Sequence, residues 1–170
     1  MLFSGVQYFT GQAFDIKRIT AAGQAVGCRV GFDLAHAVGN IPLSLHESNC
    51  DFACWCTYKY LNCGPGSIGG CFVHEKNFLG SNPDIKSFAG WWGHRISDRF
   101  DMMPAFCPSD DAYGYRLSNP PVLLIACVRA SLDLFDKVRT ITNNVYLNLP
   151  IESFIIYCCR LEWIFFERNR

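Results

Sequence analysis

Apolar positions in the first part of the chain follow two different spacings. Over residues 15–27 the apolar side chains recur at helical intervals, as at Ile16 and Ile19. Asp15 stands where it would cap the first turn of such a helix, and Gly27 stands where it would end it. The pattern therefore predicts one helix over this stretch.

Short continuous apolar runs lie before and after that helix. They occupy residues 1–9, 28–35, 50–58 and 69–75. Runs of this length that are rich in β-forming residues are typical of buried strands. Helices that alternate with such strands indicate βαβ units around a mostly parallel sheet, so the predicted fold class is α/β.

The second half of the chain begins with loop-like sequence. Proline, glycine and aspartate are frequent between the "WWGHR" and "SNPP" motifs, and residues 122–138 then carry a helical apolar face. After about residue 140 the hydrophobic period is lost. We therefore expect one domain over residues 1–140 and a divergent tail, without a predicted domain, over residues 141–170.

Composition narrows the possible functions. The 170 residues carry a net charge of zero and only 18% charged side chains, which suits one globular domain. A neutral chain without a basic run is not expected to bind nucleic acid. With no signal peptide and no apolar stretch of about 18 residues, we expect a cytoplasmic protein without a membrane span.

The ten cysteines suggest reduced, buried thiols, because several of them lie inside apolar runs. In a strand, Cys54 and Cys56 would share one face. Paired ligands with C-x2-C spacing, typical of zinc sites, are absent from the run between Cys50 and Cys71. We therefore predict no metal site, with a cysteine-based metal module as a weaker alternative.

Polar residues follow two consecutive predicted strands. Asp33 and His36 come after the strand predicted at "CRVGF", while Tyr58 and Lys59 come after the strand predicted at "FACWCT" and precede a glycine-rich turn. Ligands of open parallel sheets bind at the carboxyl ends of strands. A lysine amine can form a Schiff base, and a carboxylate can pair with a protonated pyridine nitrogen. Together, the carboxylate of Asp33 and the amine of Lys59 indicate a binding site for pyridoxal 5'-phosphate.

Four sequence motifs support the same interpretation, namely "GFDLAHAVGN", "DFACWCTYKYLNCGPG", "GWWGHR" and "YRLSNPP". In this order they closely resemble the kynureninase family of pyridoxal-phosphate enzymes, within the aspartate aminotransferase superfamily. The resemblance covers about residues 2–140. It implies a partial large domain of the aspartate aminotransferase-like fold.

The resemblance also implies residue roles. Lys59 would hold the cofactor and move protons, Asp33 would contact the pyridine nitrogen, and His36 would lie beside the ring. Tyr58 would bind the phosphate and assist proton transfer. Three further residues would complete the site, with the last two supplied across a dimer interface: Ser4, Trp91 and Asn119.

The implied reaction is the hydrolysis of L-kynurenine or 3-hydroxykynurenine to anthranilate or 3-hydroxyanthranilate and L-alanine. It would belong to tryptophan catabolism and NAD biosynthesis, and the complete enzyme would be a homodimer. The family's phosphate-cradling turn and carboxylate-binding arginine are expected outside this chain, so we expect the isolated chain to be weakly active or inactive.

Other interpretations of the same residues stay open. One is a non-catalytic fragment that pairs with a full-length copy. Another is a different class V aminotransferase-like enzyme such as a cysteine desulfurase, although desulfurases favour histidine at the position of Tyr58. Structural roles are also possible, such as a helix cap for His36 and a core position for Trp92. We assign structural or surface roles to three other histidines: His46, His74 and His94.

Overall fold

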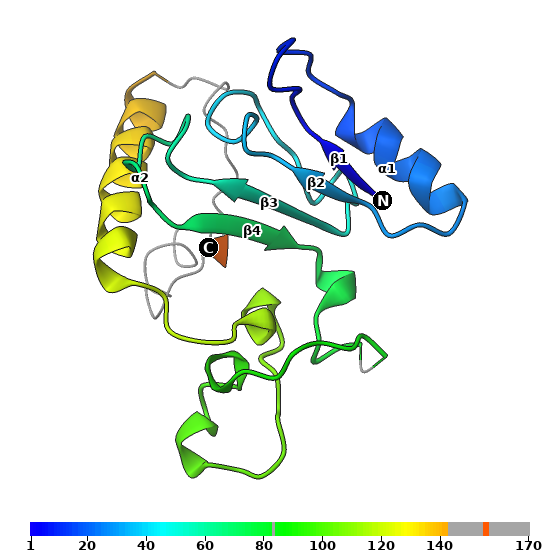
Figure 1. Ribbon diagram of the computed structural model, residues 1–170, viewed down its shortest axis with the longest axis vertical. Helices are drawn as coiled ribbons and strands as arrows, with labels where there is room; N and C mark the ends of the chain where they lie inside the picture. The colour runs from blue at the N-terminus through cyan, green and yellow to red at the C-terminus, as the bar shows by residue number, and fades with distance from the viewer. Residues whose placement is uncertain (83, 143–154, 157–170) are drawn as a thin grey trace.

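A mixed β-sheet forms the centre of the computed structural model, which describes residues 1–82, 84–142 and 155–156 (Figure 1). The first three strands run parallel to one another, and the last two are each antiparallel to the strand before. In sheet order the five strands are β1 (Leu2–Ser4), β2 (Gly31–Asp33), β3 (Phe52–Cys56), β4 (Gly69–Val73) and β5 (Ile155–Ile156).

The predicted α/β class is confirmed, and every predicted apolar run contains a strand. The strands are shorter than the runs; residues 28–35, for example, contribute only Gly31–Asp33. The direction of β4 follows from its connection. Residues 57–68 contain no helix and turn back on themselves, with the Cys63 amide donating to the Thr57 carbonyl at 3.1 Å. A parallel pairing would need a crossover, usually a helix, so β4 returns antiparallel to β3.

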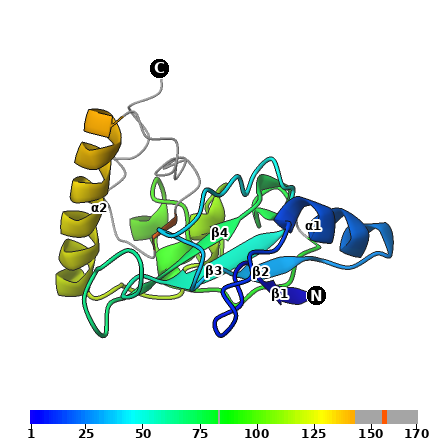
Figure 2. The same ribbon diagram turned by 90° about the horizontal axis from the view of Figure 1, so that it is seen from above.

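Helix α1 (Ile16–Ala25) begins and ends at the predicted signals. The Asp15 carboxylate accepts a hydrogen bond from the Arg18 amide at 3.0 Å. Gly27 adopts a left-handed backbone with φ of 78° just after the helix. Gly23 allows α1 to approach β2, because a Cβ atom there would lie 2.6 Å from a Val30 methyl group. The helix therefore lies against β1 and β2 (Figure 2).

Helix α2 (Val122–Thr142) lies on the other side of the molecule, beside the connection that follows β3 (Figures 1 and 2). It includes the predicted helix over residues 122–138, and the predicted boundary at residue 140 falls inside it. Of the predicted tail, residues 141–142 end α2 and residues 155–156 form β5. The remainder of residues 141–170 lies outside the described residues.

The core lies on one face of the sheet. Phe32, Ala53 and Phe72 are register neighbours on this face and are buried. Ile16 from α1 and Val128 from α2 belong to the same cluster, so both helices contribute to one core. The opposite face is partly open and presents the alternate strand residues, among them Phe52, Cys54 and Cys71.

The prediction of buried cysteines holds only in part. All eight described cysteines are free, and Cys50 and Cys63 are buried. For Cys28, Cys54 and Cys127 the prediction is wrong, because these three are exposed. Strand alternation accounts for Cys54, since it lies on the open face of the sheet while its neighbours Ala53 and Trp55 point into the core.

Between β4 and α2 the chain forms an extended lobe of loops and short 3-10 helices, which lies on the β4 side of the sheet (Figure 1). The Ser109 amide donates to the Gly93 carbonyl at 2.9 Å and ties the two sides of the lobe together. The short helices are η1 (Glu75–Asn77), η2 (Trp91–Gly93), η3 (Arg99–Asp101) and η4 (Ala112–Tyr115). In the part of the chain that the structure describes, no helix has the length and hydropathy needed to cross a membrane.

Candidate active site

Two predicted site residues end neighbouring parallel strands. Ser4 is the last residue of β1 and Asp33 the last of β2, and the two are register partners. Asp33 is exposed, and its Oδ1 accepts a hydrogen bond from the Ala35 amide at 2.9 Å. Within the described ranges no salt bridge involves Asp33. One carboxylate oxygen therefore fixes the turn after β2, while the side chain as a whole remains exposed to solvent.

Lys59 lies on a tight turn just after β3. The Asn62 amide donates to the Lys59 carbonyl at 3.1 Å, and Asn62 itself adopts a left-handed backbone with φ of 56°. Leu61 is buried, and its carbonyl accepts a hydrogen bond from the Ser131 hydroxyl of α2. The turn is thus anchored in the core and against α2, while the half-buried Lys59 side chain remains accessible.

His36 is the polar partner of Lys59. The Lys59 Nζ lies 2.9 Å from the His36 Nε2, although 23 residues separate them in sequence. In the described residues no carboxylate lies within ion-pair distance of Lys59. When Lys59 donates, Nε2 must carry the lone pair, so the imidazole proton is then on Nδ1. The contact therefore links the turn that follows β3 to the turn that follows β2.

Gly39 brings these two turns into close contact. Its backbone is left-handed with φ of 79°, and a Cβ atom would lie 3.0 Å from the backbone carbonyl carbon and oxygen of Tyr60. A side chain here would push the His36 turn away from the Lys59 turn, and glycine also adopts this φ without strain. The position of His36 opposite Lys59 therefore depends on a glycine.

Aromatic side chains surround the pair. The Lys59 Nζ lies 5.9 Å from the ring centroid of Tyr58, which is about half exposed. The centroid of the His36 ring lies 6.4 Å from that of Tyr8 and 6.2 Å from that of Tyr60. Tyr8 and Tyr60 were not among the site residues predicted from the sequence. Their positions in the sequence could have indicated them, since both follow strands whose carboxyl ends carry predicted site residues.

Trp91 and Asn119 lie elsewhere. The Trp91 indole nitrogen donates to the Arg99 carbonyl at 3.1 Å, and its ring packs edge-on against Phe100. Asn119 is exposed in the segment before α2. Among the described residues neither forms a hydrogen bond or ring contact with Lys59 or His36. The chain itself therefore does not complete the predicted set, and the prediction that a partner subunit supplies Trp91 and Asn119 stays a prediction.

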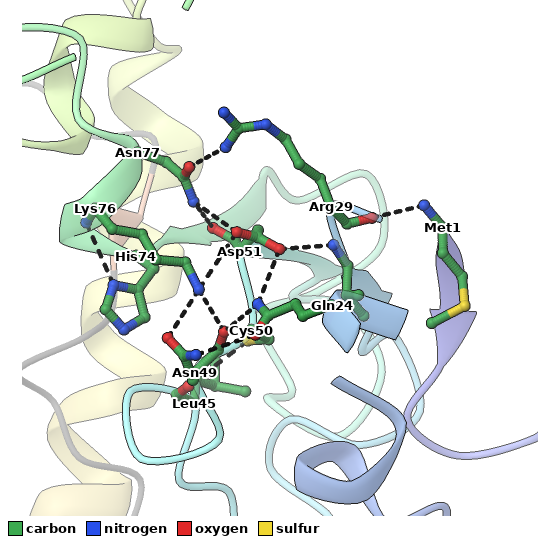
Figure 3. A network of polar contacts seen from close by, with 11 residues as sticks. Met1, Gln24, Arg29, Leu45, Asn49, Cys50, Asp51, His74, Lys76 and Asn77 are labelled. Atoms are coloured by element: carbon green, nitrogen blue, oxygen red, sulfur yellow. Dashed lines mark hydrogen bonds and ion pairs between the residues drawn. The ribbon is translucent and has the colours of Figure 1, made fainter. Parts of the chain in front are cut away.

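The amino ends of the parallel strands carry a different kind of polar cluster, centred on the buried Asp51 (Figure 3). Its carboxylate accepts hydrogen bonds from the Val30 amide at 2.7 Å, from Asn77 at 3.1 Å and from Gln24 at 3.2 Å. The Lys76 ammonium lies 3.3 Å away. Burial alone would raise the pKa of Asp51, but these donors and the ammonium outweigh it and hold the pKa below its ordinary value.

Two groups of residues of metal-binding types lie close together in the fold, and the spacing of the cysteines in the sequence does not indicate either group. They are His46, His74 and Glu75, and His94, Asp98 and Cys107. In each group the buried histidine already accepts a backbone hydrogen bond at Nδ1, at 3.3 Å for His74 and 3.2 Å for His94. A neutral ring then carries its proton on Nε2 and has no lone pair there for a metal. Both rings fit structural roles.

Comparisons with known proteins identify relatives of this chain. Residues 1–84 match the family model "Aminotransferase class-V". A kynureninase from Xanthomonas oryzae is 58% identical over 137 residues, which is 81% of this chain and 32% of that protein. A kynureninase from Nematostella vectensis is 60% identical over 137 residues, again 81% of this chain and 29% of that protein. The chain thus spans about a third of the length of these relatives.

Solved structures support the fold. A cysteine desulfurase from Escherichia coli superposes with a TM-score of 0.61 at 18% identity, over 89% of this chain and 34% of that one. A cysteine desulfurase from Thermococcus onnurineus gives a TM-score of 0.53 at 14% identity, over 84% of this chain and 37% of that one. At such identities the likeness concerns the α/β fold, and the sequence relatives decide the family.

Proposed function

Since the chain belongs to the kynureninase family, we propose that it provides the lysine side of a kynureninase active site and binds pyridoxal 5'-phosphate through Lys59. The observation that carries this proposal is the 2.9 Å contact between the Lys59 Nζ and the His36 Nε2 at the carboxyl ends of parallel strands. An amine that contacts an imidazole and no carboxylate, within the described residues, is not fixed as one half of an ion pair.

The side chains present fit this cofactor. The cofactor would supply an aldehyde carbon and an electron-accepting ring. Lys59 offers the amine for the aldehyde, and Asp33 offers a carboxylate without an ion-pair partner in the described part of the chain. Ser4 and Tyr58 add hydroxyl groups at the carboxyl ends of β1 and β3. An acid, an amine and hydroxyls are the groups that a pyridinium, an aldehyde and a phosphate require.

Each side chain then has a role in catalysis. We assign to Lys59 the proton transfers at the substrate α-carbon, because its amine is the proposed attachment point of the cofactor. His36 orients that amine, and Asp33 would keep a pyridine nitrogen protonated. Tyr58 would bind the phosphate and donate a proton from its phenol. Trp91 and Asn119 would come from the second subunit of a homodimer.

The proposed substrates are L-kynurenine and 3-hydroxykynurenine, hydrolysed to anthranilate or 3-hydroxyanthranilate and L-alanine in tryptophan catabolism and NAD biosynthesis. The proposed location is the cytoplasm. A second candidate is a cofactor-binding subunit without turnover. The length of the chain favours it, since the chain spans only about a third of the kynureninases that it resembles.

A titration with pyridoxal 5'-phosphate tests the proposal. We expect a saturable visible absorbance band in the wild type, loss of the band in Lys59→Ala, and an unchanged band in Lys86→Ala, which removes an exposed lysine outside the site. Loss of the band in both variants, or in neither, would contradict the proposal. Release of anthranilate from L-kynurenine, followed by its fluorescence, separates the enzyme from the binding subunit.

A further inference from the structure

Two cysteines face each other across strands β3 and β4. Cys54 and Cys71 are register partners in this antiparallel pair. The His74 amide donates to the Asp51 carbonyl at 3.0 Å, which makes Asp51 and His74 a hydrogen-bonded pair at the start of the ladder. Because hydrogen-bonded and non-hydrogen-bonded pairs alternate, Cys54 and Cys71 occupy a non-hydrogen-bonded position.

This position brings the two side chains close together. In non-hydrogen-bonded pairs the Cα atoms are about 4.5 Å apart, and the side chains leave the sheet on the same face. Disulfides require Cα separations of about 4.4 to 6.8 Å. The pair therefore satisfies the main requirement for a disulfide without a change of register, and both sulfurs lie on the open face of the sheet.

We propose that Cys54 and Cys71 form a reversible cross-strand dithiol, which a low-molecular-weight disulfide converts into an intrachain disulfide. The Cys54 thiolate attacks the reagent disulfide, forms a mixed disulfide and releases one reagent thiolate. The Cys71 thiolate then attacks the Cys54 sulfur and releases the second reagent thiolate. The two protons lost by the cysteines are taken up by the two released thiolates, and the reagent is reduced to two thiols.

Exposure decides which cysteine reacts first. Cys54 is exposed and Cys71 only partly so, so the reagent reaches Cys54 and Cys71 resolves the mixed disulfide. Burial raises the pKa of the Cys71 thiol to about 11, with a further contribution from Cys54. Burial and the neighbouring Asp33 carboxylate raise the pKa of Cys54 as well. Closure should therefore be slow at neutral pH and faster as the pH rises.

Other described cysteines are less well placed to pair with Cys54. Cys56 lies two residues along the same strand, at a Cα separation of about 6.8 Å, the upper limit for a disulfide. Cys56 itself faces Gly69 across the ladder. The strongest rival pair is Cys63 and Cys127, which line a surface hollow of about 460 Å³ between the Lys59 turn and α2.

The location of the pair connects its oxidation state to the surroundings of Asp33, and this connection does not depend on the proposed function. Cys54 is the register partner of Asp33 on β2. It also lies on the strand that leads directly to the Lys59 turn. A disulfide at this point would join β3 to β4 beside a carboxylate at the carboxyl end of the sheet. The oxidation state would therefore alter the surroundings of Asp33.

Disulfide mapping tests the proposal on the wild-type chain. The reduced protein is incubated with oxidised glutathione, the remaining thiols are alkylated, and the digest is analysed by mass spectrometry. We expect the Cys54–Cys71 link to exceed any other link that contains Cys54 by about tenfold, since register fixes this pair alone. Added dithiothreitol should restore both thiols.

Two controls make the result decisive. In concentrated urea the register is lost, so Cys54 should instead pair with cysteines that are near in sequence, such as Cys50 and Cys56. In Cys71→Ser, Cys54 should stop at the mixed disulfide with glutathione. The proposal is overturned if Cys54 and Cys71 stay reduced while Cys63 and Cys127 pair, or if the same link forms equally well in urea.

Discussion

The two ends of the parallel strands hold polar groups of opposite character. At the amino ends, the buried Asp51 accepts three hydrogen bonds and lies beside the Lys76 ammonium. At the carboxyl ends, the exposed Asp33 accepts a hydrogen bond from one backbone amide among the described residues, and Lys59 contacts an imidazole nitrogen. Both ends thus carry an aspartate and a lysine, but only the amino end pairs them with each other.

We expect the polar groups at the amino ends to contribute to stability and those at the carboxyl ends to bind a ligand. A buried carboxylate surrounded by donors holds strands and helices together, and its removal leaves several donors unsatisfied. Polar groups with few partners contribute little to stability and are free to meet a ligand. The comparison therefore predicts that substitutions at the amino end change the free energy of unfolding, while substitutions at the carboxyl end change cofactor binding.

The largest expected effect comes from Asp51→Ala. The Val30 amide and the Asn77 and Gln24 side chains would lose their common acceptor inside the protein. We expect the free energy of unfolding to fall by about 3 kcal/mol, measured by urea denaturation. Asp33→Ala is the matched control, with an expected loss below about 0.5 kcal/mol. An equal loss of unfolding free energy in the two variants would contradict the assignment of stability to the amino end.

Gly39→Ala should have the next largest effect. The new methyl group would meet the Tyr60 backbone at 3.0 Å in a left-handed conformation. We expect a loss of about 2 kcal/mol, because backbone strain and steric overlap add. Gly27→Ala is the control, since Gly27 has a similar φ of 78° and open space around it, so that only the strain of about 1 kcal/mol remains. A smaller loss at Gly39 than at Gly27, in urea unfolding curves, would argue against close contact of the two turns.

Acid should weaken the amino-end cluster specifically. The folded pKa of Asp51 lies below that of an unfolded aspartate. Its contribution is therefore complete above the unfolded pKa of about 3.9 and is lost as the pH falls through the lower folded pKa. The stability difference between the wild type and Asp51→Asn, measured by urea denaturation at a series of pH values, should thus shrink on going from neutral pH to below the folded pKa. A difference that stays constant or grows in acid would contradict this assignment.

The smallest effect is expected for Ser131→Ala. This variant removes the hydroxyl that donates to the Leu61 carbonyl beneath the Lys59 turn, but the Cys63 thiol still donates to the same carbonyl. We expect a loss of about 1 kcal/mol or less in urea unfolding, with faster amide hydrogen exchange at residues 59–62. Unchanged exchange in this turn would show that α2 does not anchor it.

Local signals explain which features could be predicted from sequence. Helix α1 was predicted to within two residues because Asp15 and Gly27 mark its ends by themselves. The carboxyl-end residues were found because Asp33 and Lys59 lie at or just after the ends of predicted strands. The direction of β4 was not evident from its own residues, since it depends on whether the preceding connection crosses over the sheet.

Long-range contacts explain what the sequence analysis missed. The Asp51 cluster joins Gln24, Val30 and Asn77, which are each more than 20 residues from Asp51 in sequence. The exposure of Cys54 depends on which face of the sheet the helices cover. Alternation predicted that Cys54 and Cys56 share a face, but it could not tell that this face is the open one.

The most direct test of the comparison uses the two lysines. The chain is incubated with pyridoxal 5'-phosphate, reduced with borohydride and digested, and the labelled peptides are quantified by mass spectrometry. We predict that the label is on Lys59, while Lys76, engaged with Asp51 and Asn49, stays largely unlabelled. A label on Lys76 equal to or greater than that on Lys59 would contradict the assignment of binding to the carboxyl end.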